Sequence, residues 1–348
     1  MLSGTRLILT DLAPNTHARS SGHLENNYGH DDEKNQSLYT KLQIKMRNFK
    51  IRNLPFAMKS EMIRGFFLDP KEQEHGITPC DIGDVVISYN LNCILVSRCN
   101  SARIVVFDLA TKEFQCFLNA PRSSPRYMCI EEDNQGHDTL IIFACDQCVF
   151  KYDLQRCLEN VNKVEWRKIW ESDHCGWPQG IAIPRSKKSS VYVCDILSDQ
   201  VVELNASNGQ LLSKFRVDRA FSITFAYPSC RDQNKEYMVV TTVENNSSVQ
   251  IFTQCKDDQG HCSWQSVKRI GNIGSDLGSF KNPCGVVCDN KHIIVSDCDN
   301  VRIQVFSLDN FEFIDSYEVV DKGYPYGVCL DGSSGELFVC GAESAFDG

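Results

Sequence analysis

Short runs of β-branched and aromatic residues, separated by turns rich in Asp and Asn, recur along most of this chain. The clearest example is the stretch 280–306, in which apolar runs occupy residues 283–289, 292–297 and 301–306. Val, Ile and Phe suit a pleated, half-buried surface, and Asn and Asp bond their own backbone at tight corners. The stretch therefore predicts three short strands joined by two turns, and a sheet this small needs neighbours to be stable.

The same order of parts occurs about 100 residues earlier, at residues 177–204, which indicates an internal repeat. Both units begin with a Pro-x-Gly tripeptide and end their second run on an Asp. The matching residues are Pro178, Gly180 and Asp195 in the earlier unit and Pro283, Gly285 and Asp297 in the later one. Weaker units of similar length begin near residues 79, 125, 221 and 324. The repeat length is typical of a propeller blade.

This pattern resembles the NHL repeat. The resemblance rests on the Pro-x-Gly strand, on the strand that ends in Val-x-Asp, and on the strand that follows Asn300 and contains Arg302. It implies an all-β fold, a six-bladed β-propeller of the NHL or TolB-like kind over residues 41–348. It also implies structural roles for Asn300, Arg302 and Gly327. Residues 1–40 are expected to hold a short strand and a disordered polar linker.

The sixth unit has two predicted strands where the others have three or four. An incomplete last sheet would leave an unpaired edge, which is an aggregation hazard. Residues 7–10 and 42–46 are strand-like and belong to no other unit. We expect one or both to complete the last blade and close the ring. The alternative is a chain that is incomplete at its C-terminus.

Composition places the protein among ordinary soluble chains. It is 42% hydrophobic and 23% charged, which is typical of a globular domain. It has no apolar run long enough to span a membrane and no signal-peptide pattern at its start, so we expect a cytoplasmic protein. Its 18 cysteines should then be reduced thiols. Five occupy predicted strands as small core residues: Cys194, Cys284, Cys288, Cys329 and Cys340.

Two cysteine clusters could bind metal, but neither is complete. Cys145 and Cys148 form a C-x-x-C pair, and His261 stands beside Cys262 a few residues after Cys255. A structural zinc site needs four ligands, so we expect no metal and no cofactor. The chain also lacks the common nucleophile-elbow, phosphate-loop and zinc-protease motifs. We therefore expect no enzyme activity. A metal-dependent lactonase-like or lyase-like propeller is the alternative.

A basic strip covers residues 41–64, with seven Lys and Arg and only one acid, Glu61. It could bind nucleic acid or an acidic partner, or it could be an edge strand protected by outward charges. The chain has a net charge of −9, so the surface outside the strip is acidic. Because phosphate neutralisation dominates RNA binding, single-stranded RNA on a propeller rim is a lesser alternative.

Loops on one rim of the propeller are the predicted binding surface, because loops on a rigid scaffold usually carry function. By the resembled layout, this rim holds the loops before each first strand and after each second strand. The candidate binding residues are Arg98, His174, Trp177, Phe280, Tyr324 and Tyr326, of residue types that are enriched at hot spots. Trp177 and Phe280 could instead fill gaps between blades.

Asp195 and Asp297 end their strands where a turn begins, so a capping role is sufficient for them. The resemblance includes ubiquitin ligases that select targets with a propeller beside a RING domain, although no RING-like Cys/His array precedes the propeller here. We therefore expect a non-catalytic scaffold for a protein or peptide ligand with no membrane partner, and the resemblance implies target recognition in ubiquitin-dependent pathways as its role.

Overall fold

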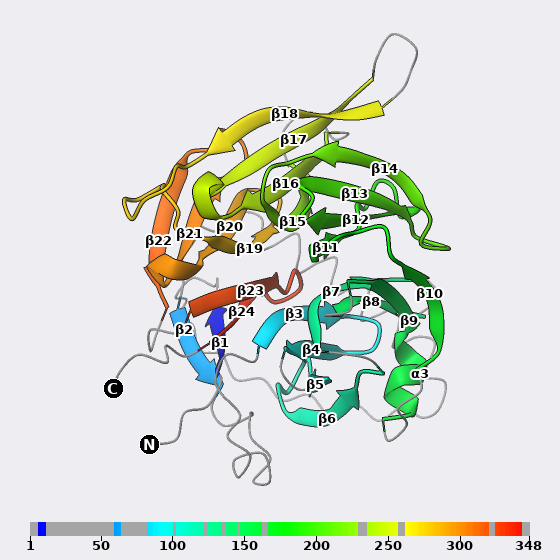
Figure 1. The fold of residues 1–348 in the computed structure, drawn as a ribbon. Coiled ribbons are helices and arrows are strands. Elements are labelled where there is room, and N and C mark those ends of the chain that lie inside the picture. The colour runs from blue at the N-terminus through cyan, green and yellow to red at the C-terminus, as the bar shows by residue number, and fades with distance from the viewer. Residues whose placement is uncertain are drawn as a thin grey trace, which may run out of the picture.

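A computed structural model describes residues 6–11, 59–63, 82–99, 102–121, 124–133, 137–144, 147–161, 166–228, 235–256, 262–319 and 324–342. The described chain is an all-β propeller, with sheets arranged around a common centre (Figure 1). The polar segment 14–38 and the strand expected at 42–46 lie outside the described residues. No helix of the described part is long and apolar enough to cross a membrane.

Five four-stranded sheets are formed by consecutive strands, each running from the centre outward. Their strands are β3 (Ile82–Ser88), β4 (Cys93–Arg98), β5 (Arg103–Asp108) and β6 (Phe114–Asn119); β7 (Pro125–Glu131), β8 (Thr139–Ala144), β9 (Val149–Asp153) and β10 (Lys168–Ser172); β11 (Pro178–Ala182), β12 (Ser190–Asp195), β13 (Gln200–Asn205) and β14 (Leu211–Arg216); β15 (Ala220–Ala226), β16 (Tyr237–Thr242), β17 (Ser248–Lys256) and β18 (Cys262–Ile270); and β19 (Pro283–Cys288), β20 (His292–Asp297), β21 (Arg302–Ser307) and β22 (Phe313–Glu318). The short helices are α3 (Leu154–Glu159), η1 (Glu244–Asn246) and η2 (Cys298–Asn300).

The remaining sheet joins the two ends of the chain. Its order is β2-β1-β24-β23, with β1 (Arg6–Asp11), β2 (Lys59–Ile63), β23 (Tyr324–Leu330) and β24 (Glu336–Ala342). Residues 7–10 pair with β24 as the sequence predicts, with Leu7 opposite Cys340. The outermost strand is β2, from the C-terminal part of the basic strip. Figure 1 shows β1 and β2 beside β23 and β24.

The inner strands share one register. In each sheet, the third residue of the second strand is the register partner of one residue of the adjacent inner strand. These inner residues are Val86, Cys129, Ala182, Thr224, Val287 and Cys329. A bulge interrupts each of these pairings near its start, which bends a strand and increases its twist. We name these six residues the inner ring.

Hydrophobic clusters fill the junctions between neighbouring sheets. Second strands such as β4, β12 and β16 are buried along their whole length, as expected for strands covered on both faces. The sheet that holds β23 and β24 packs on both of its neighbours. Its Phe338 and Cys340 join a cluster with Ile94 of β4, and its Leu337 joins one with Ile303 of β21.

The Pro-x-Gly glycines lie where neighbouring inner strands approach most closely. A Cβ at Gly180 would be 2.6 Å from the Cα of Ser222 in the next sheet, and one at Gly285 would be 2.4 Å from the carbonyl oxygen of Tyr326. A Cβ at Gly327 would be 2.8 Å from the Cα of Asp84. Only glycine therefore fits these positions without displacing the next strand.

Candidate functional site

The two repeat aspartates hold the loops that lead into the inner strands. The Asp195 carboxylate accepts hydrogen bonds from the backbone N–H groups of Gly176 (2.9 Å) and Trp177 (2.8 Å) and from Gln200 Nε2 (3.0 Å). Burial acts to raise the pKa of Asp195, but these hydrogen bonds outweigh it and leave the pKa below its ordinary value. The Asp195 carboxylate therefore has a structural role in holding this loop.

Asp297 also holds the loop before its inner strand, and the buried guanidinium of Arg302 is an additional hydrogen-bond partner. Its Oδ1 accepts from the backbone N–H of Lys281 (2.7 Å), and its Oδ2 accepts from Asn300 Nδ2 (2.8 Å) and Arg302 Nε (2.8 Å). The Arg302 guanidinium also donates to the carbonyl groups of Ser275, Asp276 and Ser279. Burial raises the pKa of Asp297, and the hydrogen bonds only partly offset it. The cluster ties a twelve-residue loop to the strand ends.

The structure separates the six predicted rim residues into two groups. Phe280 is fully buried and packs on Phe306, and Arg98 is 3% exposed. Neither can meet a partner, so the prediction is wrong for both. Phe280 instead fills the gap between two sheets. His174 is exposed, while Trp177, Tyr324 and Tyr326 are half-buried.

The same rim also carries exposed aliphatic residues that were not predicted from the sequence. Leu197 is 67% exposed, Leu277 is 66% exposed and Ile273 is 56% exposed. They are the three most exposed large hydrophobic side chains of the described residues, and all three lie in loops of the predicted rim. The other exposed apolar side chains lie on outermost strands. The sequence signal that could have identified the three rim side chains is an apolar residue within a turn that is otherwise rich in Asp and Ser.

Polar contacts link these loops from sheet to sheet. Arg219, before β15, pairs with Glu244, after β16. The backbone N–H of Glu244 donates to Asn282 Oδ1 (3.0 Å), and Asn282 Nδ2 donates to Asp299. Arg219, Glu244 and Asn282 all have positive φ, which is uncommon outside glycine. The contacts fix the loops of two adjacent sheets relative to each other.

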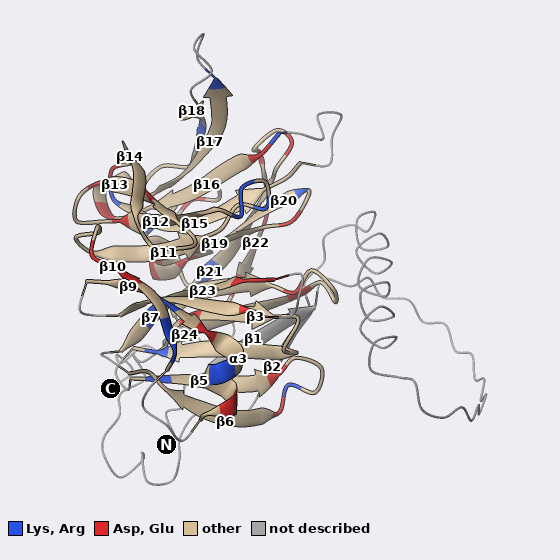
Figure 2. Cartoon of the chain, turned by 90° about the vertical axis from the view of Figure 1, so that its right-hand side faces the viewer, with Lys and Arg blue, Asp and Glu red and all other residues tan. Residues whose placement is uncertain are grey.

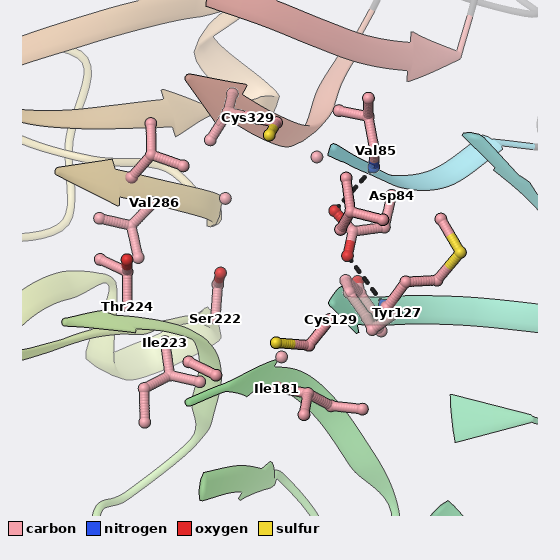
Figure 3. A pocket seen from close by; sticks show the side chains of 18 of the residues that line it. Asp84, Val85, Tyr127, Cys129, Ile181, Ser222, Ile223, Thr224, Val286 and Cys329 are labelled. Atoms are coloured by element: carbon pink, nitrogen blue, oxygen red, sulfur yellow. Dashed lines mark hydrogen bonds between the residues drawn. The ribbon is translucent and has the colours of Figure 1, made fainter. Parts of the chain in front are cut away.

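A cavity of about 320 Å³ occupies the centre of the propeller and is lined by all six inner strands. The inner ring lines it, and none of the predicted rim residues does. Figure 3 shows the cavity with side chains from these strands around it. Its charged lining residues are Asp84 and Arg185. Asp84 could not be recognised from the sequence because it replaces the repeat glycine in a weak unit.

The thiols around the cavity are neutral. Cys288 and Cys329 were expected in the core with Cys194, Cys284 and Cys340; the latter three are buried, but Cys288 and Cys329 are half-buried and line the cavity. Burial raises the pKa of Cys129 to about 12 and that of Cys329 further. Such thiols are poor nucleophiles and behave as small apolar groups.

Among the described residues, no group of three or more His, Cys, Asp or Glu side chains could hold a metal ion. Cys145 and His261, from the two candidate clusters, lie outside this part of the chain. Acidic and basic residues are interspersed over the face seen in Figure 2.

Comparison with known proteins supports the fold class. No family model matches the chain, and no curated protein sequence matches it. A similar solved structure is hydrazine synthase from Kuenenia stuttgartiensis, with 12% sequence identity and a TM-score of 0.50. The likeness covers 80% of this chain and 95% of that chain. At this identity it shows the shared β-propeller fold alone.

Proposed function

We propose that this protein is a six-bladed, NHL-like propeller that acts as a non-catalytic scaffold and binds an extended peptide segment of a partner protein. The binding surface is the rim that carries Leu197, Ile273 and Leu277. The observation that supports it most is that these three highly exposed aliphatic side chains all lie on one rim. Exposed apolar groups gathered on one face are typical of interaction sites.

Six blades are supported by the packing of the sheet that joins the chain ends. That sheet has four strands and shares a hydrophobic cluster with each neighbour. A closed ring leaves only short, protected edges. It also provides a rigid base, so the rim loops lose little entropy when a partner binds.

The chemistry of the rim favours a peptide with large apolar side chains. Trp177 lies half-buried in the loop before β11, and Leu197 follows β12 in the same sheet. Aromatic anchors beside aliphatic groups are typical of protein hot spots. Lys281 and Asp299 add charges of both signs to the rim, which suits a peptide with polar flanks.

Peptide selection tests this function. A random peptide library would be displayed on phage and selected on the full-length protein, and the enriched peptides would be synthesised for fluorescence titration. Leu197→Glu and Leu277→Glu should each weaken binding at least tenfold, because a hot-spot contact contributes about 2 kcal/mol or more. The matched control is Ile314→Glu on β22, which is 43% exposed and lies off the rim. Selected peptides that respond equally to Ile314→Glu, or to none of the variants, would contradict the proposed rim.

A further inference from the structure

At one level of the central cavity, half of the inner-strand residues are glycines, which have no side chain. Two residues before the inner ring, the six inner strands carry Asp84, Tyr127, Gly180, Ser222, Gly285 and Gly327. Three glycines widen the cavity at this level. Asp84 on β3 and Ser222 on β15 are separated by two intervening sheets in either direction around the ring, so they lie on opposite walls. Figure 3 shows the Asp84 carboxylate and the Ser222 hydroxyl on the cavity side of their strands.

The Asp84 carboxylate retains capacity to accept a donor from the cavity. Its Oδ1 accepts from the backbone N–H of Val85 (2.9 Å), and its Oδ2 accepts from the backbone N–H of Met128 (3.0 Å). An ionised carboxylate has about four acceptor sites, so these bonds occupy about half of them. Both hydrogen bonds also fix the carboxylate in place between two sheets, which preorganises it for a ligand.

The lining cation lies at a different height. Arg185 follows the end of β11, five residues beyond Gly180. At about 3.3 Å per residue, the two strand residues after Gly180 alone rise roughly 7 Å, and Arg185 lies three residues beyond the end of the strand at Ala182. Its guanidinium lies over the ring of Tyr227, 5.6 Å from the ring centroid. The negative charge of Asp84 and the positive charge of Arg185 are thus presented at separate ends of the cavity.

Between these ends, the inner ring presents small side chains to the cavity. The inner ring contributes valine, alanine, threonine and neutral cysteine side chains. A cavity of about 320 Å³ is at the lower end of the range for small-molecule sites, roughly 300–1,000 Å³. It can hold a compact aliphatic or aromatic group.

We propose that the central cavity binds a small molecule with one primary ammonium group and an apolar tail. The ammonium donates to the Asp84 carboxylate, which faces the Ser222 hydroxyl across the cavity, and the tail lies against the inner ring. A second ammonium on the tail would be placed against apolar groups or toward Arg185, and burying an unpaired charge is costly. The site therefore prefers monoamines to diamines and to uncharged analogues. The cavity is a different surface from the peptide rim, and amine binding there does not depend on the rim.

Binding should increase with pH, because the ligand needs the ionised carboxylate. Burial raises the pKa of Asp84 to about 7, against smaller opposing effects of the hydrogen bonds from Met128 and Val85. The ionised fraction then rises about tenfold between pH 6 and pH 8, and the affinity should rise by the same factor. The titratable or charged groups on the strands around Asp84 are Arg98 and Cys93 on β4; Arg126, Tyr127, Cys129 and Glu131 on β7; Tyr324, Tyr326 and Cys329 on β23; and Glu336 and Cys340 on β24. Tyr127, Cys129, Cys329 and Cys340 have a raised pKa and stay neutral over this range.

The test uses the full-length protein and three six-carbon probes: n-hexylamine, 1-hexanol and 1,6-diaminohexane. Ligand-detected NMR titration at pH 8 should give an affinity for n-hexylamine at least tenfold higher than for the other two. At pH 6 the amine should bind about tenfold more weakly, as the pKa of Asp84 requires. Equal binding of n-hexylamine and 1-hexanol, or no saturable binding of the amine, would overturn the proposal.

Variants locate the site. Asp84→Asn should abolish the preference for the amine and the pH dependence, and Ala182→Leu should block all three probes by filling the inner ring. Ser222→Ala removes only the hydroxyl and should weaken amine binding severalfold, which keeps the test valid if Asp84→Asn does not fold. Asp315→Asn, an exposed change on β22, is the matched control. Melting curves would verify folding, and amine binding that survives Ala182→Leu and Ser222→Ala in folded protein would refute the site.

Discussion

Replacing Asp297 by Ala should destabilise the protein severely, because it removes the counterion of a buried arginine. The Asp297 carboxylate is fully buried and accepts hydrogen bonds from Lys281, Asn300 and Arg302. Arg302 is itself 9% exposed. In the variant its guanidinium keeps the carbonyl partners of the loop but loses its negative partner.

The expected loss is about 3–5 kcal/mol in the free energy of unfolding, the usual cost of leaving one buried charge without its partner. Asp195 provides an internal comparison, because its hydrogen-bond partners are two backbone N–H groups and an amide. Asp195→Ala should cost less, about 1–3 kcal/mol for the unsatisfied donors. The difference between the two variants measures the contribution of the buried arginine.

Urea denaturation followed by tryptophan fluorescence would measure both values. The double variant Asp297→Ala/Arg302→Met should lose less stability than the sum of the two single variants, because it removes the orphaned charge together with its partner. If Asp297→Ala cost less than 1 kcal/mol, or if the double variant lost the sum of both single effects, the structural role derived for this cluster would be refuted.

Three further predictions concern the centre and the closure of the ring. The folded-state pKa of Asp84, about 7, exceeds its ordinary value near 4, so its contribution to stability is full below pH 4 and is lost as pH rises to 7. Unfolding free energy should fall by about 1–2 kcal/mol between pH 5.5 and pH 7.5, and an unchanged slope in Asp84→Asn would contradict this origin. Gly285→Ala should cost about 1–3 kcal/mol by overpacking, since its Cβ would meet the Tyr326 carbonyl oxygen at 2.4 Å; equal stability in urea would show that the strands can separate. Deleting residues 1–63 should lower the melting temperature of the whole domain by exposing the edge of β24, and unchanged melting would argue against closure.

The sequence predicts the repeated elements well because each carries its own local signals. Pro178 and Pro283 begin inner strands, and Asp195 and Asp297 end second strands, as expected from their positions in the repeat. The pairing of residues 7–10 with the last sheet also follows from sequence, because an apolar run needed a partner. These features depend on a few neighbouring residues.

Features that depend on neighbouring sheets were not predicted. Phe280 and Trp177 both stand before a Pro-x-Gly tripeptide, but only packing against Phe306 decides that Phe280 is fully buried. Ser296 donates to the carbonyl oxygen of Tyr326 in the next sheet (2.8 Å), a contact that no local pattern reveals. The same holds for Asp84, whose importance comes from facing a cavity built by six strands.

Backbone NMR can detect closure of the ring by the N-terminal strand directly. In deuterated full-length protein, cross-strand backbone NOEs should connect β1 with β24 in the register that places Leu7 opposite Cys340 and Leu9 opposite Phe338. The amides of β24 should be protected from exchange on both sides of the strand. Absence of these NOEs, together with rapid exchange of the β24 amides that face β1, would contradict closure.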